Sequence, residues 1–197
     1  RFDIENRKSK VISFDDIFEI ERIVTLEESE KSLVSHIIKI ENRSNFFYIS
    51  DNRHSIVIRF DADGNYVNTI GSEGTGPGEV TRLSSFQVDD EYLYLLDRIK
   101  ILKYKIDGTF IEEFSKRYFT IDFNINDGMC TIYNINVPSY DQIIKYDSTY
   151  ISSISFSPNR ELPLVMGMLG RDYFYNLKNR YYYTYPYADT IYELIDT

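Results

Sequence analysis

The chain has 197 residues, enough for one domain with its own hydrophobic core. Its 31 acidic and 22 basic residues give a formal net charge of −9, which would repel a phosphate backbone and argues against a nucleic-acid partner. Tyrosine and phenylalanine contribute 18 and 13 residues, whereas alanine occurs only as Ala62 and Ala188. Aromatic residues favour pleated sheets and alanine is the best helix former, so the composition predicts an all-β fold.

The first predicted elements are a polar lead-in segment, residues 1–18, and a strand over Glu19–Leu26. The polar start is typical of a chain whose export signal has been removed. No apolar run in the sequence approaches the ~20 residues that a membrane-spanning helix needs. We therefore predict a single domain over residues 1–197 with no transmembrane segment.

A repeat unit begins after this strand. In its first copy, the strand Asn45–Asp51 is followed by a basic loop and by the alternating strand Ser55–Phe60, which leads into Asp63 and Gly64. Asp-Gly between alternating strands is a strong hairpin signal, because glycine supplies the positive φ of the primed two-residue turns. The segment Val34–Ile40 upstream is predicted as the innermost strand of this copy.

The second copy repeats these features in the same order. Its strand Glu91–Asp97 precedes a basic loop, and a further alternating strand leads into Asp107 and Gly108. The segment Leu83–Val88 is predicted as its innermost strand. Both copies therefore have three strands and a turn before their outermost strand, as in a meander.

Two less complete copies follow. A third copy over Gln142–Ile151 has Ser148 in place of the glycine, and a half-copy over Asp189–Thr197 ends the chain. These copies are preceded by strands predicted over Gly128–Tyr133 and Arg171–Asn176. The turn aspartates, which are Asp63, Asp107, Asp147 and Asp196, are spaced by 44, 40 and 49 residues. The period of ~40–50 residues is typical of β-propeller blades, each a four-stranded antiparallel sheet, and predicts about four blades in this chain.

The fourth copy ends inside its turn, which leaves several possibilities open. The strand Glu19–Leu26 could complete the last blade and close the ring, or the chain could be part of a longer protein. An open strand edge promotes aggregation, so one of these should hold. A homo-oligomer, in which a second copy completes the ring, is a third possibility.

A glycine-rich connector over Ile70–Val80 joins the first two copies and contains Gly74, Gly76, Pro77 and Gly78. A phosphate-binding loop of the Walker type needs Gly-Lys-Ser/Thr at the start of a helix. Here no lysine follows the glycines, and strands are predicted on both sides. We interpret the connector as a structural turn between blades.

The connector, the opening segment Val11–Phe18 and the segment Tyr183–Tyr192 together resemble the bacterial six-bladed β-propeller family related to NHL-repeat proteins. The resemblance implies a six-bladed ring on an exported or lipid-anchored envelope protein. Many members of that family have no assigned activity. Because only about four blades are present, the resemblance also implies that this chain is incomplete at its C-terminus relative to the family.

The sequence predicts no metal or cofactor site. The acidic segment that starts at Asp61 imitates a calcium loop, but its twelfth position is Ser72 where a bidentate glutamate is needed. His36 lies in a predicted strand and His54 in a loop, which argues against a zinc site built from the histidines. Propeller enzymes of the lactonase type hold a metal in the central channel. Asp51, Asp97 and Asn176 occupy comparable positions, but nothing in the sequence shows that they converge.

No catalytic residues are predicted either. Cys130 lies in an alternating strand, so we expect a buried, unreactive thiol. A nucleophilic serine on a Gly-x-Ser-x-Gly turn is absent from the sequence.

The leading hypothesis is a non-enzymatic binding or scaffold module of the bacterial cell envelope, exported to the periplasm or cell surface. A propeller displays the loops of all its blades on one rim, which suits partner binding. The cations Arg53, His54, Arg98 and Lys100 would make this rim basic and able to attract an acidic protein or carbohydrate partner. The alternative is a metal-dependent hydrolase or lyase with its site in the central channel.

Overall fold

The computed structural model describes residues 13, 18–98, 100–115, 120–126, 129–134, 143–146, 174–177, 180–183 and 191–194. Every regular element in this part of the chain is a β-strand, which confirms the all-β prediction. The described strands form two four-stranded and two three-stranded antiparallel sheets. Among the same residues, no helix is long and apolar enough to cross a bilayer.

The four sheets follow one another along the chain, and we number them sheets 1 to 4. Sheet 1 contains β1 (Ile37–Arg43), β2 (Phe46–Asp51), β3 (Ile56–Phe60) and β4 (Tyr66–Ile70). Sheet 2 contains β5 (Ser85–Val88), β6 (Tyr92–Leu96), β7 (Lys100–Lys105) and β8 (Phe110–Ser115). Sheet 3 contains β9 (Thr120–Asn126), β10 (Met129–Asn134) and β11 (Ile143–Tyr146). Sheet 4 contains β12 (Phe174–Leu177), β13 (Arg180–Tyr183) and β14 (Tyr192–Leu194).

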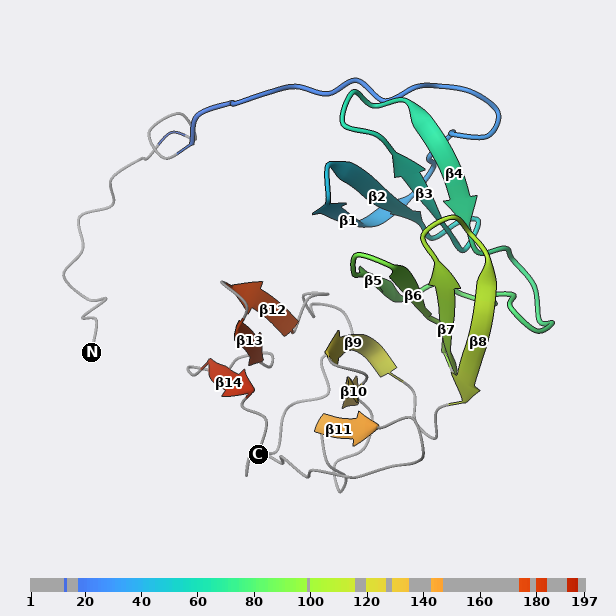
Figure 1. The fold of residues 1–197 in the computed structure, drawn as a ribbon, viewed down its shortest axis with the longest axis vertical. Helices are drawn as coiled ribbons and strands as arrows, with labels where there is room; N and C mark the ends of the chain where they lie inside the picture. Colours follow the sequence, from blue (N-terminus) through green and yellow to red (C-terminus); the bar gives the residue numbers. More distant parts are fainter. Residues whose placement is uncertain are drawn as a thin grey trace.

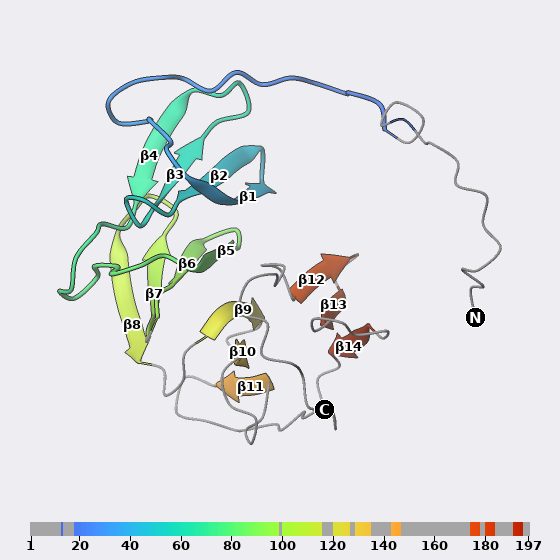
Figure 2. The ribbon, with the colours of Figure 1, turned by 180° about the vertical axis from the view of Figure 1, so that it is seen from behind.

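The sheets lie along an arc, with the first strand of each sheet toward its centre (Figure 1; Figure 2 from behind). Contacts join β1 to β5, β5 to β9 and β9 to β12, so the inner strands of successive sheets are neighbours. β4 and β8 lie on the outer side of the arc (Figure 1). The arc is not closed, because sheet 1 and sheet 4 remain apart in both views.

The innermost strand of sheet 1 begins later than predicted. The sequence pattern indicated Val34–Ile40, but β1 spans Ile37–Arg43. Its register is set by the turn to β2, in which Ser44 and Asn45 both have positive φ, 50° and 65°. Arg43 pairs with Phe46 across this two-residue turn, which is the geometry of a type I′ hairpin. The corresponding strand in sheet 2 also begins later than predicted, at Ser85, and ends at Val88 as expected.

The Asp-Gly turns lie where the sequence predicted them, but their type differs. Gly64 and Gly108 have φ of 88° and 93°, whereas Asp63 and Asp107 do not have positive φ. The Asp61 amide donates to Asn65 O and the Gly64 amide to Asp61 O, which encloses a three-residue loop. A type I turn followed by a left-handed glycine and a bulge fits this pattern, so the expectation of primed turns was wrong. The third and fourth turns, at Asp147 and Asp196, lie outside the described residues.

The strand predicted over Glu19–Leu26 is absent. Residues 18–28 form no strand, and we call residues 18–34 the strap. The strap runs along sheet 1 before β1 (Figure 1), where the Glu27 amide donates to Gly64 O at 2.7 Å and Glu27 Oε2 accepts from the Tyr66 amide. These bonds direct the segment to the β3–β4 turn of sheet 1, so it does not complete the last sheet.

Sheet 4 also departs from the expected alignment. The segment Arg171–Asn176 was predicted to be the second strand of its copy, but β12 is the first strand of sheet 4. The second strand is β13, and Tyr175 pairs with Tyr182 across the two. The strands predicted over Gly128–Tyr133 and within Gln142–Ile151 are present as the paired strands β10 and β11. The lead-in segment lies almost entirely outside the described residues.

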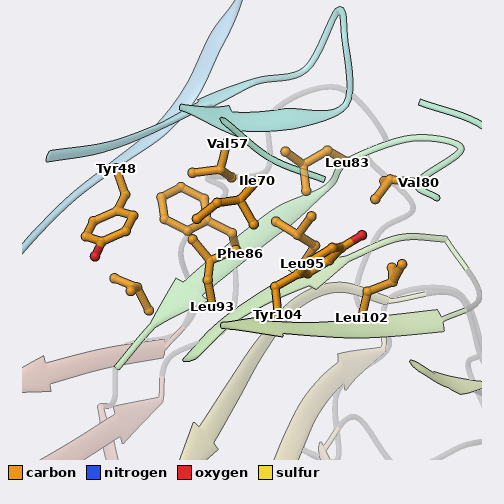
Figure 3. Packing of buried hydrophobic residues seen from close by; sticks show 11 residues of the cluster. Tyr48, Val57, Ile70, Val80, Leu83, Phe86, Leu93, Leu95, Leu102 and Tyr104 are labelled. Atoms are coloured by element: carbon orange, nitrogen blue, oxygen red, sulfur yellow. The ribbon is translucent and has the colours of Figure 1, made fainter. Parts of the chain in front are cut away.

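Apolar side chains fill the space between sheets 1 and 2 (Figure 3). We call the face of each sheet that packs on the next sheet its front face, and the opposite face its back face. The front face of sheet 1 contributes Tyr48, Val57 and Ile70, and the back face of sheet 2 contributes Leu93, Leu95, Leu102 and Tyr104. Sheet 2 packs in the same way on sheet 3, where its Tyr94, Leu96 and Ile101 meet Phe123 and Cys130. Cys130 is 8% exposed, which confirms that its thiol is buried.

The two Asp-Gly turns offer a matched test of how the strap is held. Both glycines have a similar positive φ, so Gly64→Ala and Gly108→Ala should suffer similar backbone strain, about 1 kcal/mol or more. An added Cβ at Gly64 would lie 2.2 Å from the strap's Thr25 O, whereas at Gly108 the nearest atom is Thr69 O at 3.2 Å. We expect Gly64→Ala to cost about 1 kcal/mol more in urea unfolding. Hydrogen exchange at the Glu27 amide should accelerate only in Gly64→Ala, and equal exchange in both variants would contradict this assignment.

Candidate functional site

A buried aspartate, Asp51, is the last residue of β2, the second strand of sheet 1. Asp51 is fully buried and accepts hydrogen bonds from the Ser35 amide at 3.0 Å, from the Ser35 hydroxyl at 2.9 Å and from the Arg53 amide at 2.9 Å. It also accepts from the His36 amide at 3.2 Å and from His54 Nδ1 at 2.9 Å. One carboxylate therefore joins the entry into β1 to the β2–β3 loop.

Asp97 repeats this arrangement in sheet 2. It is also fully buried and accepts from the Thr81 amide and from the Thr81 hydroxyl, the latter at 2.7 Å. The Arg82 and Arg98 amides both donate to Asp97 Oδ1, at 3.2 and 2.6 Å. At both aspartates the partners at the entry into the inner strand are the amide and hydroxyl of a serine or threonine and the amide of the basic residue that follows it, and at Asp51 the His54 imidazole adds a further bond.

The hydrogen bonds determine the protonation of both aspartates. Burial raises the pKa of Asp51, but the bonds from His54, Ser35 and Arg53 outweigh it, so this pKa lies well below its usual range. For Asp97, burial is likewise outweighed by the donors on Thr81, Arg98 and Arg82, and its pKa is also lowered. A carboxylate whose pKa is lower in the folded state stabilises the fold above about pH 4, and that contribution disappears as the pH falls further.

Each buried aspartate bonds the backbone amides of a pair of basic residues at the protein surface. Arg53 and His36 donate their amides to Asp51 Oδ1, and Arg82 and Arg98 donate theirs to Asp97 Oδ1. All four side chains are exposed. The lone pairs of the aspartates are directed at amides and hydroxyls, and the guanidinium groups of these three arginines make no bond to any described residue. We call these four residues and His54 the rim.

The predicted rim residues thus differ in their surroundings. Arg53 and Arg98 are exposed, and the His54 side chain is 50% exposed with its Nδ1 on Asp51. Lys100 is only 8% exposed, and its ammonium binds Glu113 at 2.9 Å and Gly76 O at 3.2 Å. The Lys100 ammonium beside Glu113 also lowers the pKa of that carboxyl. Lys100 therefore serves as an internal ion pair and adds no exposed cation.

Arg82 and the position of His36 on the rim were not recognised in the sequence analysis. A signal for them exists, because Ser35 and Asp51 are separated by 16 positions, as are Thr81 and Asp97. A hydroxyl residue followed by a basic residue, with aspartate at this distance, marks both copies. This pattern can be interpreted only when the structure shows that the hydroxyl donates to the aspartate.

Ser35, His54 and Asp51 lie together but do not form a catalytic triad. The Ser35 hydroxyl donates to Asp51, and its 3.5 Å contact with His54 involves the same Nδ1 that already bonds Asp51. In a triad the serine bonds the ring nitrogen that faces away from the aspartate, so that the imidazole can take its proton. The arrangement here stabilises the start of β1 and does not activate Ser35.

The connector folds around the carboxylate of Glu79, which is one of its own residues. The Gly76 amide donates to Glu79 Oε2 at 2.8 Å, and a side chain at Gly74 would lie 2.0 Å from the same oxygen. The Gly78 amide donates to Glu113 Oε2 at 3.1 Å, and the Tyr104 hydroxyl donates to Gly78 O. Burial raises the pKa of Tyr104 to about 12, so it acts as a neutral donor. Protein carboxylates occupy the backbone amides that could hold an anion, which supports the structural interpretation of the connector.

Asp51 and Asp97, which the sequence analysis considered as ligands of a channel metal, already accept hydrogen bonds from protein groups. Amide and hydroxyl protons point at Asp51 and Asp97, which leaves these carboxylates poorly suited to a cation. Among the described residues, no group of three or more histidine, cysteine, aspartate or glutamate side chains is placed to bind a metal. The Asn176 backbone lies in β12.

Replacement of Asp51 by asparagine tests the role of the buried carboxylate. The amide group would face the donors that now bond the carboxylate, so Asp51→Asn should destabilise the protein by about 2–3 kcal/mol at pH 7. Because the lowered pKa is removed, the loss of stability between about pH 4 and pH 2 should be shallower than in the wild type. Urea unfolding at several pH values measures both effects. Asp63→Asn, which removes the same charge from an exposed turn, should change stability by less than about 0.5 kcal/mol; equal losses in the two variants would refute the assignment.

A double-mutant cycle tests the connector. Gly74→Ala should displace the Glu79 carboxylate and cost about 1–2 kcal/mol, the worth of its bond to the Gly76 amide. Glu79→Ala should cost a similar amount, and the double variant should cost no more than either alone. Thermal unfolding of the three variants measures the coupling. Additive losses would mean that Gly74 and Glu79 act independently.

Comparison with solved structures finds two Bacteroides proteins of similar fold. A Bacteroides fragilis protein described as exported is 25% identical, with a TM-score of 0.72 over 87% of this chain and 51% of its own. A member of the DUF4221 family from Bacteroides vulgatus is 14% identical, with a TM-score of 0.59 over 85% of this chain and 57% of its own. This chain therefore spans little more than half the length of either structure. The computationally designed protein Ika4 is 10% identical, with a TM-score of 0.50 over 88% of this chain and 97% of its own.

Sequence comparison gives a family without a known activity. No curated protein matches the chain significantly. The profile of a domain of unknown function, DUF4934, matches residues 1–197. Because this match extends over the whole sequence, the chain belongs to the DUF4934 family.

Proposed function

We propose that this protein is a non-enzymatic binding module of the bacterial cell envelope that contacts an acidic protein or carbohydrate partner through its rim. The observation that carries the proposal is the set of three exposed arginines, Arg53, Arg82 and Arg98, on a protein whose net charge is −9. Arginine presents a planar fork of donors that suits carboxylate recognition. The guanidinium groups of these arginines can bind a partner because Asp51 and Asp97 accept hydrogen bonds from the arginine backbone amides.

Rigid support adds to this proposal. The three segments that carry the arginines are each fixed at the backbone by a buried carboxylate, so a partner would bind side chains whose backbone is already ordered. Preorganised groups lose less conformational entropy on binding than groups on a mobile loop. The same arrangement occurs in sheets 1 and 2, so a pair of basic residues recurs from one sheet to the next.

The architecture proposed for this module is a β-propeller, six-bladed in the longer protein. The meander order of sheets 1 and 2, the neighbouring inner strands and the front-to-back packing of successive sheets all support it. The greater length of the two Bacteroides structures supports the presence of further blades outside this chain. The description of the Bacteroides fragilis protein as exported supports an envelope location, with lipid anchoring as part of the proposal.

Charge reversal at the rim tests the binding function. Immobilised polyglutamate and polygalacturonate serve as an acidic peptide and an acidic glycan, and binding is measured by biolayer interferometry at low salt. We expect the wild type to bind at least one of them, and the double variant Arg82→Glu/Arg98→Glu to bind it about tenfold more weakly or worse, which corresponds to about 1.4 kcal/mol. Binding should also weaken as salt is added.

The matched control lies at the opposite end of the same sheet. Lys105 is exposed at the end of β7, next to the Asp107 turn, and Lys105→Glu makes the same kind of charge change away from the rim. Binding by this variant should be close to that of the wild type. If Lys105→Glu weakens binding as much as the single variant Arg98→Glu, net charge and not the rim is responsible, and the proposal fails.

A further inference from the structure

Two arginines of sheet 2 have their backbones bonded to the same carboxylate oxygen. Arg82 precedes β5 and Arg98 follows β6, and the amides of both donate to Asp97 Oδ1, at 3.2 and 2.6 Å. Both side chains are exposed. Although these residues are far apart in the chain, their side chains therefore start from one small area of the rim.

Sheet 1 has a mixed pair at the equivalent place. The His36 and Arg53 amides donate to Asp51 Oδ1, at 3.2 and 2.9 Å. Arginine keeps its charge throughout the physiological pH range, whereas histidine titrates within that range. Of the two pairs, the one in sheet 2 is therefore the pair with two permanent positive charges.

The neighbouring charges only partly neutralise this arginine pair. Asp97 is buried, and its oxygens accept hydrogen bonds from amides and from a hydroxyl. Lys100 and Glu113 bind one another at 2.9 Å, so their ion pair adds no net charge. One buried negative charge thus accompanies two exposed positive charges, on a protein whose net charge is −9.

Two adjacent guanidinium groups favour a ligand that carries two negative charges on one group. A carboxylate has a single charge and two oxygens, which the fork of one arginine already satisfies. A phosphate monoester has a charge of about −1.5 to −2 at pH 7 and three acceptor oxygens. It can therefore bind both forks and offset the repulsion between them, which a single carboxylate cannot do.

We propose that Arg82 and Arg98 form a binding site for a phosphate monoester group on the partner of this protein. The inference rests on the proposed function, because it uses the same rim, and it names the chemical group that the rim recognises. The two guanidinium groups donate to the phosphate oxygens, while the backbone amides of the same residues stay on Asp97.

A hydrogen bond between the sheets places further cations next to this site. The Ser55 hydroxyl accepts from the Leu83 amide at 3.3 Å, and both residues are buried. Leu83 directly follows Arg82 in the chain. Ser55 directly follows His54, in the loop that carries Arg53. The rim of sheet 1 is thus bonded to the segment that carries the phosphate site, and a second acidic group on the same partner would bind there.

Matched small ligands test the site on the 197-residue protein. Blocked phosphoserine is compared with blocked glutamate, and glucose 6-phosphate with glucuronate, so that each pair sets a phosphate against a carboxylate. NMR titration of the Arg82 and Arg98 backbone amides measures affinity and location together. We expect each phosphate to bind at least about fivefold more tightly than its carboxylate counterpart. A preference between the two phosphates would identify a protein or a carbohydrate as the source of the group.

Arg98→Lys separates the arginine fork from its charge. Lysine keeps the positive charge and the amide bond to Asp97 but loses the bidentate geometry, so phosphoserine binding should weaken about fivefold. Arg82→Ala/Arg98→Ala should abolish it, with an unchanged circular dichroism spectrum because both amides remain. Lys105→Ala, which removes an exposed cation at the other end of β7, is the matched control and should leave phosphoserine binding unchanged.

The outcomes separate this inference from the proposed function. Equal binding of phosphates and carboxylates would overturn the phosphate site, while rim-dependent binding of the acidic polymers would leave the proposed function standing. If phosphoserine binds and neither polymer does, the phosphate site stands and the broader proposal fails. Titration shifts that leave out the Arg82 and Arg98 amides would also overturn the phosphate site, as would equal losses in Arg98→Ala and Lys105→Ala.

Discussion

The hydrogen-bonded carboxylate at the end of the second strand is the constraint on which sheets 1 and 2 depend. Asp51 and Asp97 are each fully buried, and each bonds the segment that enters the inner strand as well as the loop that leaves the second strand. Burial of a charge is costly unless donors surround it, and here amides and hydroxyls provide them. The same bonds leave nearby arginine side chains free at the surface. Stability and the candidate binding surface therefore have one physical origin.

A second repeated interaction stabilises the front faces. In sheet 1 the Arg59 guanidinium lies 3.7 Å from the centre of the Phe46 ring, and in sheet 2 the Lys103 ammonium lies 4.1 Å from the centre of the Tyr92 ring. Arg59 also donates to Ile106 O in the turn of sheet 2. The aromatic residues that suggested strands in the sequence thus pair with cations inside the fold. These cations belong to the sheet interfaces and differ in role from the cations of the rim.

The sequence pattern was most informative where local chemistry decides the outcome. The Asp-Gly positions were correctly predicted as turns because a left-handed residue favours glycine, and β2 and β6 were correctly placed by alternation and aromatic content. The turn type was wrong because Asp-Gly can fit a two-residue or a three-residue loop, and the bulge between Arg59 and Phe60 decides between them. The strand predicted over residues 19–26 was wrong, because this segment pairs with no described strand and is instead followed by the Glu27 amide bond to Gly64 O in the β3–β4 turn.

The sequence by itself determined that this protein is all-β, that its strands recur in copies, that its net charge is negative, and that basic residues follow the second strand of the first two copies. Composition, periodicity and turn residues are local properties, and a reader of the sequence can recognise them. Only the tertiary structure decided that Lys100 is an internal partner of Glu113 while Arg82 belongs to the rim. It also decided that the connector glycines enclose Glu79 and that Leu26 and Val34 of the strap pack on the back face of sheet 1. These outcomes depend on contacts between residues far apart in the chain, whose geometry is set when the sheets pack together.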